Sequence, residues 1–284
     1  HDIAWAIESH RDDIARKLGL DPVEFRLKNI FVEGAESPGG AILRGVGLKE
    51  CLEKVALALE WGKPKTTNRG KAIACFDKHP NPASSSCAVV WLNVDGNVTL
   101  LSGAMEIGQG LMTVLAQICA EELGVKVEDI KVVIGDTGTT PFDDGAYGSR
   151  LTEAAGNAVR LAAKDARDQV LKTAAMELEV GYDDLEMKQG RIFVKGSPDR
   201  GMSLSELSLK VHRSEPGPIL GRGSYFGGGK GYSQVAGSKR QEEWGWKYGA
   251  TGVEVEVDTE TGAIKILKVV SAHDVGFAIN PQLV

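Results

Sequence analysis

Two glycine-flanked turns hold the residues whose types and spacing best suit ligand chemistry. The first is Gly108-Gln109-Gly110, and the second is the run Gly145-Ala146-Tyr147-Gly148-Ser149-Arg150. Each turn precedes an apolar stretch with helical spacing. A helix start offers unpaired backbone N–H groups and the positive end of the helix dipole, and adjacent glycines let a ligand approach the backbone closely. Two such starts in one domain can hold the two ends of an elongated, anionic cofactor.

The first turn centres on Gln109. Its amide has two N–H donors and an acceptor oxygen, so it can form hydrogen bonds with a carbonyl, an oxo group or a pterin edge. The adjacent backbone N–H groups can bind an anion. Thr113 lies one helical turn further along, on the same side of the helix start. The alternative is a plain helix N-terminus behind a glycine turn, because the tripeptide alone is too short to exclude it.

The second turn offers several polar groups. Ser149 suits either a ligand contact or the N-cap of the following helix, and Thr152 lies on the first turn of that helix. Arg150 carries a charge suited to phosphate. A salt bridge from Arg150 to Asp143 or Asp144 is an equally good interpretation.

Other catalytic patterns are missing from the sequence. It has no GxSxG elbow, no Walker loop and no HExxH helix. The glycine run at residues 227–231 resembles a phosphate loop but lacks the GK[ST] ending. His273 and Asp274 are neighbours near the end of a predicted strand, so we expect their side chains to point to opposite faces and not to form a dyad.

The composition is that of an ordinary globular protein. The 284 residues, of which 42% are hydrophobic and 25% charged, are enough for one large core or two lobes. A net charge of −6 argues against a nucleic-acid surface. No apolar run reaches the ~18 residues of a membrane span, and no signal peptide opens the chain, so we expect a cytoplasmic protein. CxxC spacing is missing, which argues against zinc or iron–sulfur ligation and favours buried, reduced thiols at Cys51, Cys75, Cys87 and Cys119.

The elements that position the two turns follow from apolar periodicity. Residues 109–123 predict a helix, residues 130–134 a short strand, and residues 149–178 a long helix whose alanines indicate close packing against a sheet or another helix. The intervening loop at residues 135–148 is long and polar, and such loops are often functional. Further strands are predicted at residues 71–76, 87–94, 97–101, 188–194 (a hairpin), 253–257 and 264–270.

The chain divides into a helical part and a mixed part. Apolar residues recur at helical spacing before Gly19, and an amphipathic helix at residues 48–61 precedes a linker. We place the boundary after residue 66. The glycine-rich region between residues 214 and 249 predicts an extended excursion. Together the elements predict an α+β fold with mixed sheets and packed helices, and the likeness of two hairpins suggests an internal ββαβ-like duplication.

Motifs along almost the whole chain resemble the molybdenum-binding (large) subunit of the xanthine dehydrogenase and aldehyde oxidase family, although less clearly at residues 214–249. The similar segments keep the order and spacing of that family. They are Leu18–Pro22, Arg26–Asn29, Met105–Gly110, Ala116–Gly124, Gly135–Thr137, Tyr147–Arg150, Ala155–Arg160, Ala272–Gly276 and Ala278–Pro281.

The resemblance implies a molybdopterin cofactor, often the cytosine dinucleotide form in bacterial relatives. The metal is then held by the cofactor's dithiolene and by non-protein groups, so no protein metal ligand is expected. Residues 1–66 become a helical connector, and residues 67–284 become the cofactor-binding domain, truncated at its C-terminus. The implied cofactor contacts are Gly108, Gln109, Gly110, Thr113, Tyr147, Gly148, Ser149, Arg150 and Thr152.

The resemblance also implies an oxidoreductase that oxidises a small-molecule substrate, an aldehyde or an N-heterocycle, with water as oxygen donor. Iron–sulfur and FAD partners would take the electrons, and the complete enzyme would be dimeric. The family's Gly-Phe-Gly loop lies upstream of the first helix, and its glutamate base lies downstream of the Asn-Pro segment. We therefore expect a fragment lacking both ends, with no catalytic base and no activity on its own.

Two alternatives stay open at this stage. One is a non-catalytic binding or assembly module that keeps the fold and holds no metal. The other is a carbon-monoxide-oxidising or aryl-CoA-reducing relative, which differs in segments that this sequence does not contain.

Overall fold

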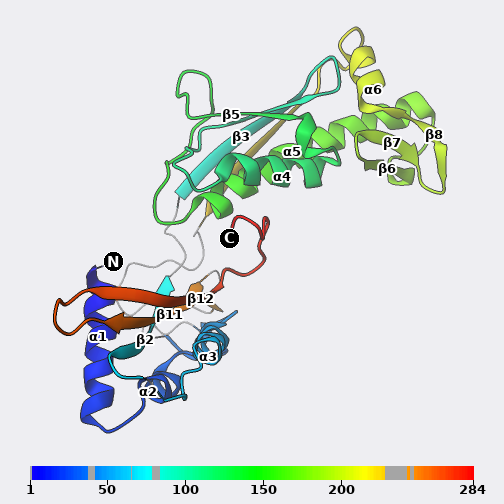
Figure 1. Ribbon diagram of the computed structural model, residues 1–284. Coiled ribbons are helices and arrows are strands. Elements are labelled where there is room, and N and C mark those ends of the chain that lie inside the picture. The colour runs from blue at the N-terminus through cyan, green and yellow to red at the C-terminus, as the bar shows by residue number, and fades with distance from the viewer. Residues whose placement is uncertain (1, 38–41, 65, 79–83, 228–241, 244–245) are drawn as a thin grey trace. The chain divides into compact units, whose positions relative to one another are not determined.

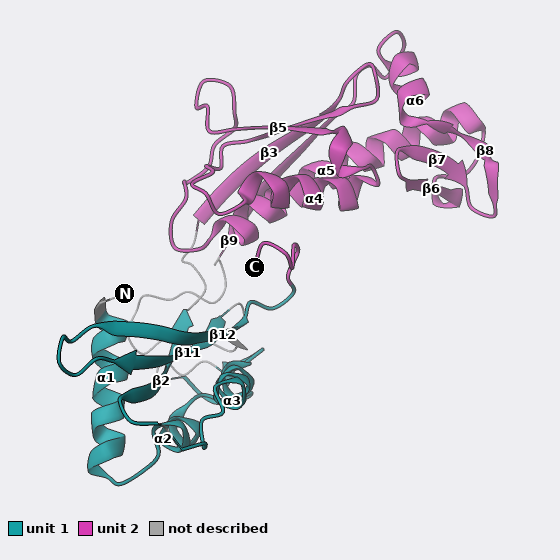
Figure 2. Cartoon of the chain, in the orientation of Figure 1, with its two compact units in different colours: residues 1–80, 231–277 teal, residues 81–230, 278–284 magenta. Residues whose placement is uncertain are grey.

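The computed structural model describes residues 2–37, 42–64, 66–78, 84–227, 242–243 and 246–284 (Figure 1). The chain forms two compact units: unit 1 comprises residues 1–80 and 231–277, and unit 2 comprises residues 81–230 and 278–284 (Figure 2). Both units combine β-sheet with packed helices, which confirms the predicted α+β class. Within the described residues, no helix is long and apolar enough to cross a membrane. The boundary predicted after residue 66 separates a helical connector from a cofactor-binding domain. The two compact units do not test it, so it stays a prediction.

Unit 1 packs helices against a three-stranded antiparallel sheet of order β12-β11-β2. Its core lies between α3 and the sheet. The packing there is close: a Cβ atom added to Gly252 of β11 would lie only 2.3 Å from Leu59 Cδ1. Two-residue strands β1 and β10 pair in parallel. The bounds are α1 Asp2–Lys17, α2 Pro22–Asn29, β1 Ile42–Leu43, α3 Leu48–Ala58, β2 Arg69–Lys78, β10 Glu242–Glu243, β11 Lys247–Val257 and β12 Ile264–Asp274.

Polar contacts, and not the predicted apolar stripe, fix α1 within unit 1. Ile3 is 74% exposed although it belongs to that stripe. Arg26 of α2 is 2% exposed; its Nη2 lies 2.9 Å from Glu8 Oε2, and its Nη1 lies 2.6 Å from Asp12 Oδ1. Glu8 Oε2 also accepts the backbone N–H of Cys75 in β2 at 2.8 Å. The buried ion pair therefore ties two helices to the sheet.

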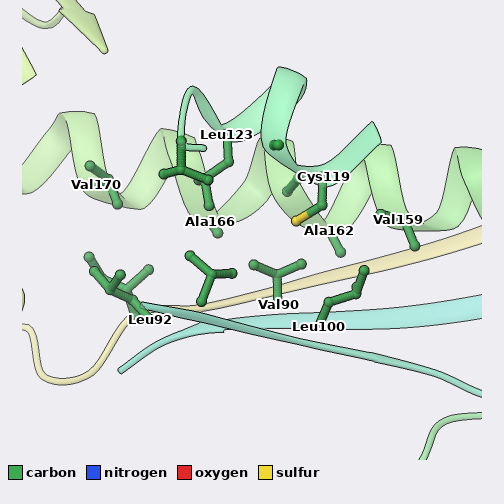
Figure 3. Close-up of a cluster of buried hydrophobic side chains, with 14 of the residues drawn as sticks. Val90, Leu92, Leu100, Cys119, Leu123, Val159, Ala162, Ala166 and Val170 are labelled. Carbon is green, nitrogen blue, oxygen red and sulfur yellow. The ribbon is translucent and has the colours of Figure 1, made fainter. Parts of the chain in front are cut away.

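Unit 2 places α4 and α5 against a four-stranded sheet of order β5-β4-β3-β9. Strands β4 and β5 are parallel, and the other pairs are antiparallel. Figure 3 shows Cys119 of α4 and Ala162 of α5 facing Val90 and Leu100 of the strands across the apolar core. The bounds are β3 Ser84–Leu92, β4 Val98–Ser102, α4 Leu111–Leu123, η1 Val127–Asp129, β5 Ile130–Ile134, α5 Leu151–Leu178 and β9 Leu220–Gly227.

Strand β9 shows where the predicted excursion at residues 214–249 is wrong. It pairs with β3 along its length. A Cβ on Gly221 would lie 2.2 Å from the carbonyl oxygen of Ala162, and a Cβ on Gly223 would lie 2.1 Å from that of Ala158. Glycine is therefore required at these two positions, because the backbone of α5 touches the strand. The same contacts confirm the close packing that we predicted from the alanines of α5. Residues 228–231 of the glycine run lie outside the described residues.

A smaller sheet extends unit 2 beyond the far end of α5. It has the order β6-β7-β8, and its first hairpin is the predicted one. Helix α6 was not predicted, although Ser203 and Glu206 form a capping box that the S-x-x-E spacing signals. The β3-β4-α4-β5 run is one ββαβ unit, and its duplication stays a prediction. The bounds are η2 Tyr182–Asp184, β6 Leu185–Lys188, β7 Arg191–Val194, β8 Ser197–Ser203 and α6 Leu204–Val211.

The cysteines are free thiols, as expected, and differ in burial. Cys119 is fully buried, whereas Cys87 is half-buried. Burial raises the pKa of Cys119 to about 12, and burial with the nearby charge of Glu8 raises that of Cys75 to about 11. No group of three or more His, Cys, Asp or Glu side chains within the described residues could hold a metal ion.

We expect iodoacetamide at pH 8 to modify Cys87 of the folded protein well before Cys75 and Cys119. The thiolate is the reactive form, and a thiol with a pKa near 12 is about 10⁻⁴ ionised at that pH. Its reactivity should rise only as the pH approaches the pKa. Peptide mass spectrometry measures the labelling, and the denatured chain, where all thiols should react, is the control. Equal rates at Cys87 and Cys119 in the folded protein would contradict the packing of α4.

Candidate functional site

Both glycine turns lie at one edge of the unit 2 sheet. Strand β4 ends at Ser102 and leads through the first turn into α4, while β5 ends at Ile134 and leads through the second turn into α5. Because β4 and β5 are adjacent and parallel, their carboxyl ends lie at the same edge. Ligands of open α/β sheets bind outside this edge, in the loops that follow the strands.

The two helix starts lie side by side. A Cβ on Gly156 of α5 would lie 3.0 Å from Ile118 Cδ1 of α4, and one turn later Arg160 Nη1 lies 3.9 Å from Glu122 Oε2. The paired positions advance in the same direction along both helices, so α4 and α5 are parallel. Packed helices are about 8–10 Å apart, which sets the separation of the two starts. The geometry therefore brings together the two turns that the sequence singled out.

The first turn has a backbone conformation suited to glycine, and its glutamine side chain is held by hydrogen bonds. Gly108 has a φ of 101° and Gly110 a φ of 79°, values that favour glycine. The Gln109 side chain is exposed; its Oε1 accepts the N–H of Ile107 at 2.7 Å, and its Nε2 donates to the carbonyl of Met105 at 3.0 Å. These bonds leave one N–H and one lone pair of the amide for a ligand. Thr113 is exposed on α4, one turn away.

Glu106 belongs to this turn, and the sequence reasoning did not select it. Its Oε1 accepts the N–H groups of Gly108 at 2.8 Å and Gly110 at 3.1 Å, and its Oε2 accepts that of Met112 at 3.1 Å. The N–H groups of Met112, Gly108 and Gly110 hold the pKa of Glu106 below its usual value. A carboxylate shortly before a helix start was the available signal.

Arg150 closes the second turn from inside the protein. Its side chain is 1% exposed, and its Nη1 lies 2.7 Å from Asp143 Oδ1, which confirms the salt bridge proposed for that pair. Nε donates to Ser84 Oγ, Nη1 also donates to the carbonyl of Gly145, and Nη2 donates to the carbonyl of Ser85 and to Ser86 Oγ. All five N–H donors of the guanidinium are used, so the geometry favours a role in holding the loop over a phosphate contact.

The start of α5 is open on its outer side. Ser149 is not the N-cap: Arg150 holds that position, and Ser149 is exposed with a left-handed φ of 65°. Helix α5 has no side-chain cap. Among the described residues, no group accepts the first backbone N–H groups of α5, at residues 151–153. Thr152 is exposed beside them.

Exposed apolar side chains lie on the same loops as these polar groups. Tyr147 is 48% exposed, and its ring lies 5.8 Å from Arg150 Cζ. Gly148 forms the turn after it, with a φ of 60°. The other exposed apolar residues of the two loops and of the start of α4 are Met105, Ile107, Met112 and Phe142. An apolar rim around a few directed polar groups is typical of cofactor sites.

The Asn-Pro segment at residues 278–284 packs beside the first turn. Asn280 Nδ2 donates to Gln117 Oε1 of α4 at 3.3 Å. A Cβ on Gly110 would lie 3.3 Å from Leu283 Cδ1. The segment therefore covers one side of α4 near its start.

His273 and Asp274 do not form a dyad, as expected for neighbours on a strand. His273 Nε2 lies 2.9 Å from Ser271 Oγ, whereas Asp274 Oδ2 accepts the N–H of Gly47 at 2.9 Å. Asp274 supports the start of α3 within unit 1 and is not free for proton transfer with His273.

The comparisons with known proteins agree on one family. A family model described as the molybdopterin cofactor-binding domain matches residues 42–284. A putative xanthine dehydrogenase molybdenum-binding subunit from Escherichia coli (strain K12) is 33% identical over 297 residues, covering 99% of this chain and 38% of that protein. The chain thus spans 38% of the length of that curated relative.

Solved structures show the same likeness. Reconstituted CO dehydrogenase from Oligotropha carboxidovorans superposes with a TM-score of 0.81 at 25% identity, covering 99% of this chain and 37% of that one. The aldehyde oxidoreductase from Desulfovibrio desulfuricans has a TM-score of 0.71 at 26% identity, covering 97% of this chain and 28% of that one.

Proposed function

Since the chain belongs to the molybdopterin cofactor-binding domain family, we propose that it binds molybdopterin at the edge formed by the carboxyl ends of β4 and β5. The observation that carries the proposal is the pair of parallel helix starts, one braced around Gln109 and the other with open N–H groups. Such a pair suits a cofactor with a heterocyclic end and an anionic end.

The residues present fit this cofactor in distinct ways. We assign the free N–H and lone pair of Gln109 to a pterin edge or an oxo group, with Gly108 and Gly110 allowing close approach. The open start of α5, with Gly148, Ser149 and Thr152, suits an anionic phosphate. Thr113 and Tyr147 line the space around these groups, and Arg150 holds the second turn in place without touching the ligand. The bound cofactor would supply the redox-active metal.

The proposed complete enzyme oxidises an aldehyde or an N-heterocycle with water as oxygen donor. The names of the relatives support this class, since they include a xanthine dehydrogenase subunit and an aldehyde oxidoreductase. We further propose the cytosine dinucleotide form of the cofactor, iron–sulfur and FAD partners, a dimeric complete enzyme and a cytoplasmic location. No residue of this chain is assigned as the catalytic base.

A carbon-monoxide-oxidising relative is the second candidate. The CO dehydrogenase large chain of Afipia carboxidovorans is 27% identical over 310 residues, covering 99% of this chain. Assays of the full-length protein with an aldehyde, a purine and carbon monoxide distinguish the two reactions. A full-length protein that is free of molybdenum and pterin after co-expression with its partners would instead favour a non-catalytic assembly module.

We expect Gln109→Ala to lower the pterin content of the full-length protein on the order of 10-fold. The substitution removes a hydrogen-bond pair of about 1 kcal/mol per bond and loosens the turn that presents it. Fluorescence of the oxidised pterin released on denaturation, per mole of protein, measures the loss. The control is Gln189→Asn, at an exposed hairpin tip whose φ of 50° asparagine tolerates. Wild-type pterin content in Gln109→Ala would contradict the assigned contact.

A further inference from the structure

The carboxylate of Glu106 ties together the backbone on both sides of Gln109. It accepts the N–H of Gly108, just before the glutamine, and the N–H of Gly110, just after it. The glutamine side chain is meanwhile bonded to the carbonyl of Met105 and to the N–H of Ile107, on either side of Glu106. The side chain of Glu106 thus holds the backbone on both sides of Gln109, and the side chain of Gln109 holds the backbone on both sides of Glu106. Gly108 and Gly110, both at positive φ, have no side chains of their own to hold the shape of the turn.

The same carboxylate occupies the positive end of α4. Its second oxygen accepts the N–H of Met112, in the first turn of the helix. A helix start that already carries a carboxylate repels a second anion. The start of α5 differs, because it has no side-chain cap. The two neighbouring starts thus differ in their backbone N–H groups: at α4 the Glu106 carboxylate accepts them, whereas at α5 no side chain does, although Glu153 lies in the first turn of that helix.

We propose that Glu106 is a positioning residue for cofactor binding: it fixes the orientation of the Gln109 amide and keeps anionic groups away from the start of α4. The anionic end of the cofactor is thereby directed to α5, and the neutral heterocyclic end to Gln109. This inference rests on the proposed function. The binding orientation then depends on the half-buried carboxylate of Glu106, which touches no ligand atom itself.

The test uses Glu106→Gln in the full-length protein, co-expressed with its partners. The amide keeps the size of the side chain, removes its charge and turns an N–H donor toward a backbone N–H. We expect pterin content to fall on the order of 10-fold, since a hydrogen bond to a charged group is lost. The molybdenum EPR signal per bound pterin should also change shape, because the Gln109 amide is no longer held. Glu121→Gln, exposed on the same helix, is the charge-matched control.

A conservative variant separates positioning from stability. Glu106→Asp keeps the charge with a shorter reach, and we expect it to recover part of the pterin content; it also carries the test if Glu106→Gln does not fold. Wild-type pterin content in Glu106→Gln overturns the inference. So does reduced pterin with an unchanged EPR line shape and a lowered unfolding temperature, which would mark a stability role only. A wild-type protein without pterin would overturn the proposed function itself.

Discussion

Arg150→Met is expected to lower the free energy of unfolding by about 3–5 kcal/mol, because it removes one partner of a buried ion pair. The side chains of Arg150 and Asp143 are 1% and 0% exposed, respectively. The methionine fills much of the space but leaves the Asp143 carboxylate buried and without its cation. It also leaves the hydroxyls of Ser84 and Ser86 without their guanidinium donor.

Urea denaturation of the protein measures this loss. Arg160→Met is the matched control on the same helix, because Arg160 is 49% exposed and its Nη1 lies 3.9 Å from Glu122 Oε2. An exposed pair of this kind contributes less than about 1 kcal/mol. Arg150→Lys should fall in between, since it keeps the charge but offers fewer donors in a different geometry. A loss below 1 kcal/mol in Arg150→Met would show that the pair is not buried in solution.

The ion pair matters for the site because it fastens the second turn to the sheet. The carbonyl of Phe142 accepts the N–H of Cys87 in β3 at 2.9 Å, and Arg150 donates to the carbonyl of Gly145. A Cβ on Gly103 would lie 2.1 Å from the carbonyl oxygen of Pro141, so the loop also lies against the end of β4. The loop is therefore held against the sheet of unit 2. Loss of the ion pair between Arg150 and Asp143 should reduce cofactor binding as well as stability.

The strongest sequence patterns correctly predicted the helices and the strand that position the site. Strand 130–134 and the end of the helix at Leu178 agree with prediction, since both are bounded by clear polar or glycine signals. The helix starts were predicted two residues early, at positions 109 and 149, because the preceding turn residues were included in the helices. Local periodicity therefore placed both turns correctly at helix starts, which is what the proposed site requires.

The roles of individual side chains were harder to predict. For Arg150 the sequence left a phosphate contact and a salt bridge as equally good interpretations. The fold shows the salt bridge to Asp143, and the burial of the guanidinium also depends on Ser84 and Ser86, which lie far away in sequence. Glu106 was not predicted to belong to the site, although a carboxylate shortly before a helix start is a signal for bonds to the first backbone N–H groups of the helix. Only the folded chain brings Arg150 to its partners in β3, whereas the partners of Glu106 lie within six residues of it.

Strand β9 was missed for a related reason, and it leads to the second large prediction. Its glycines suggested a loop, yet a Cβ on Gly223 would lie 2.1 Å from the carbonyl oxygen of Ala158 and 2.6 Å from the N–H nitrogen of Ala162. Both neighbours are helix backbone, which cannot move aside as a flexible side chain can. A glycine in a strand often marks such a close approach.

Gly223→Val is therefore expected to destabilise the protein by at least about 1–3 kcal/mol, the usual cost of overpacking, and more if α5 cannot shift. Valine favours strands by itself, so a loss can only come from the contact with α5. Gly62→Ala is the control, because its added Cβ meets nothing within 4 Å. Urea denaturation compares the two. Because α5 begins at the open helix start, its displacement should also lower pterin content in the full-length protein. Unchanged stability in Gly223→Val would show that the backbone of α5 does not lie against β9.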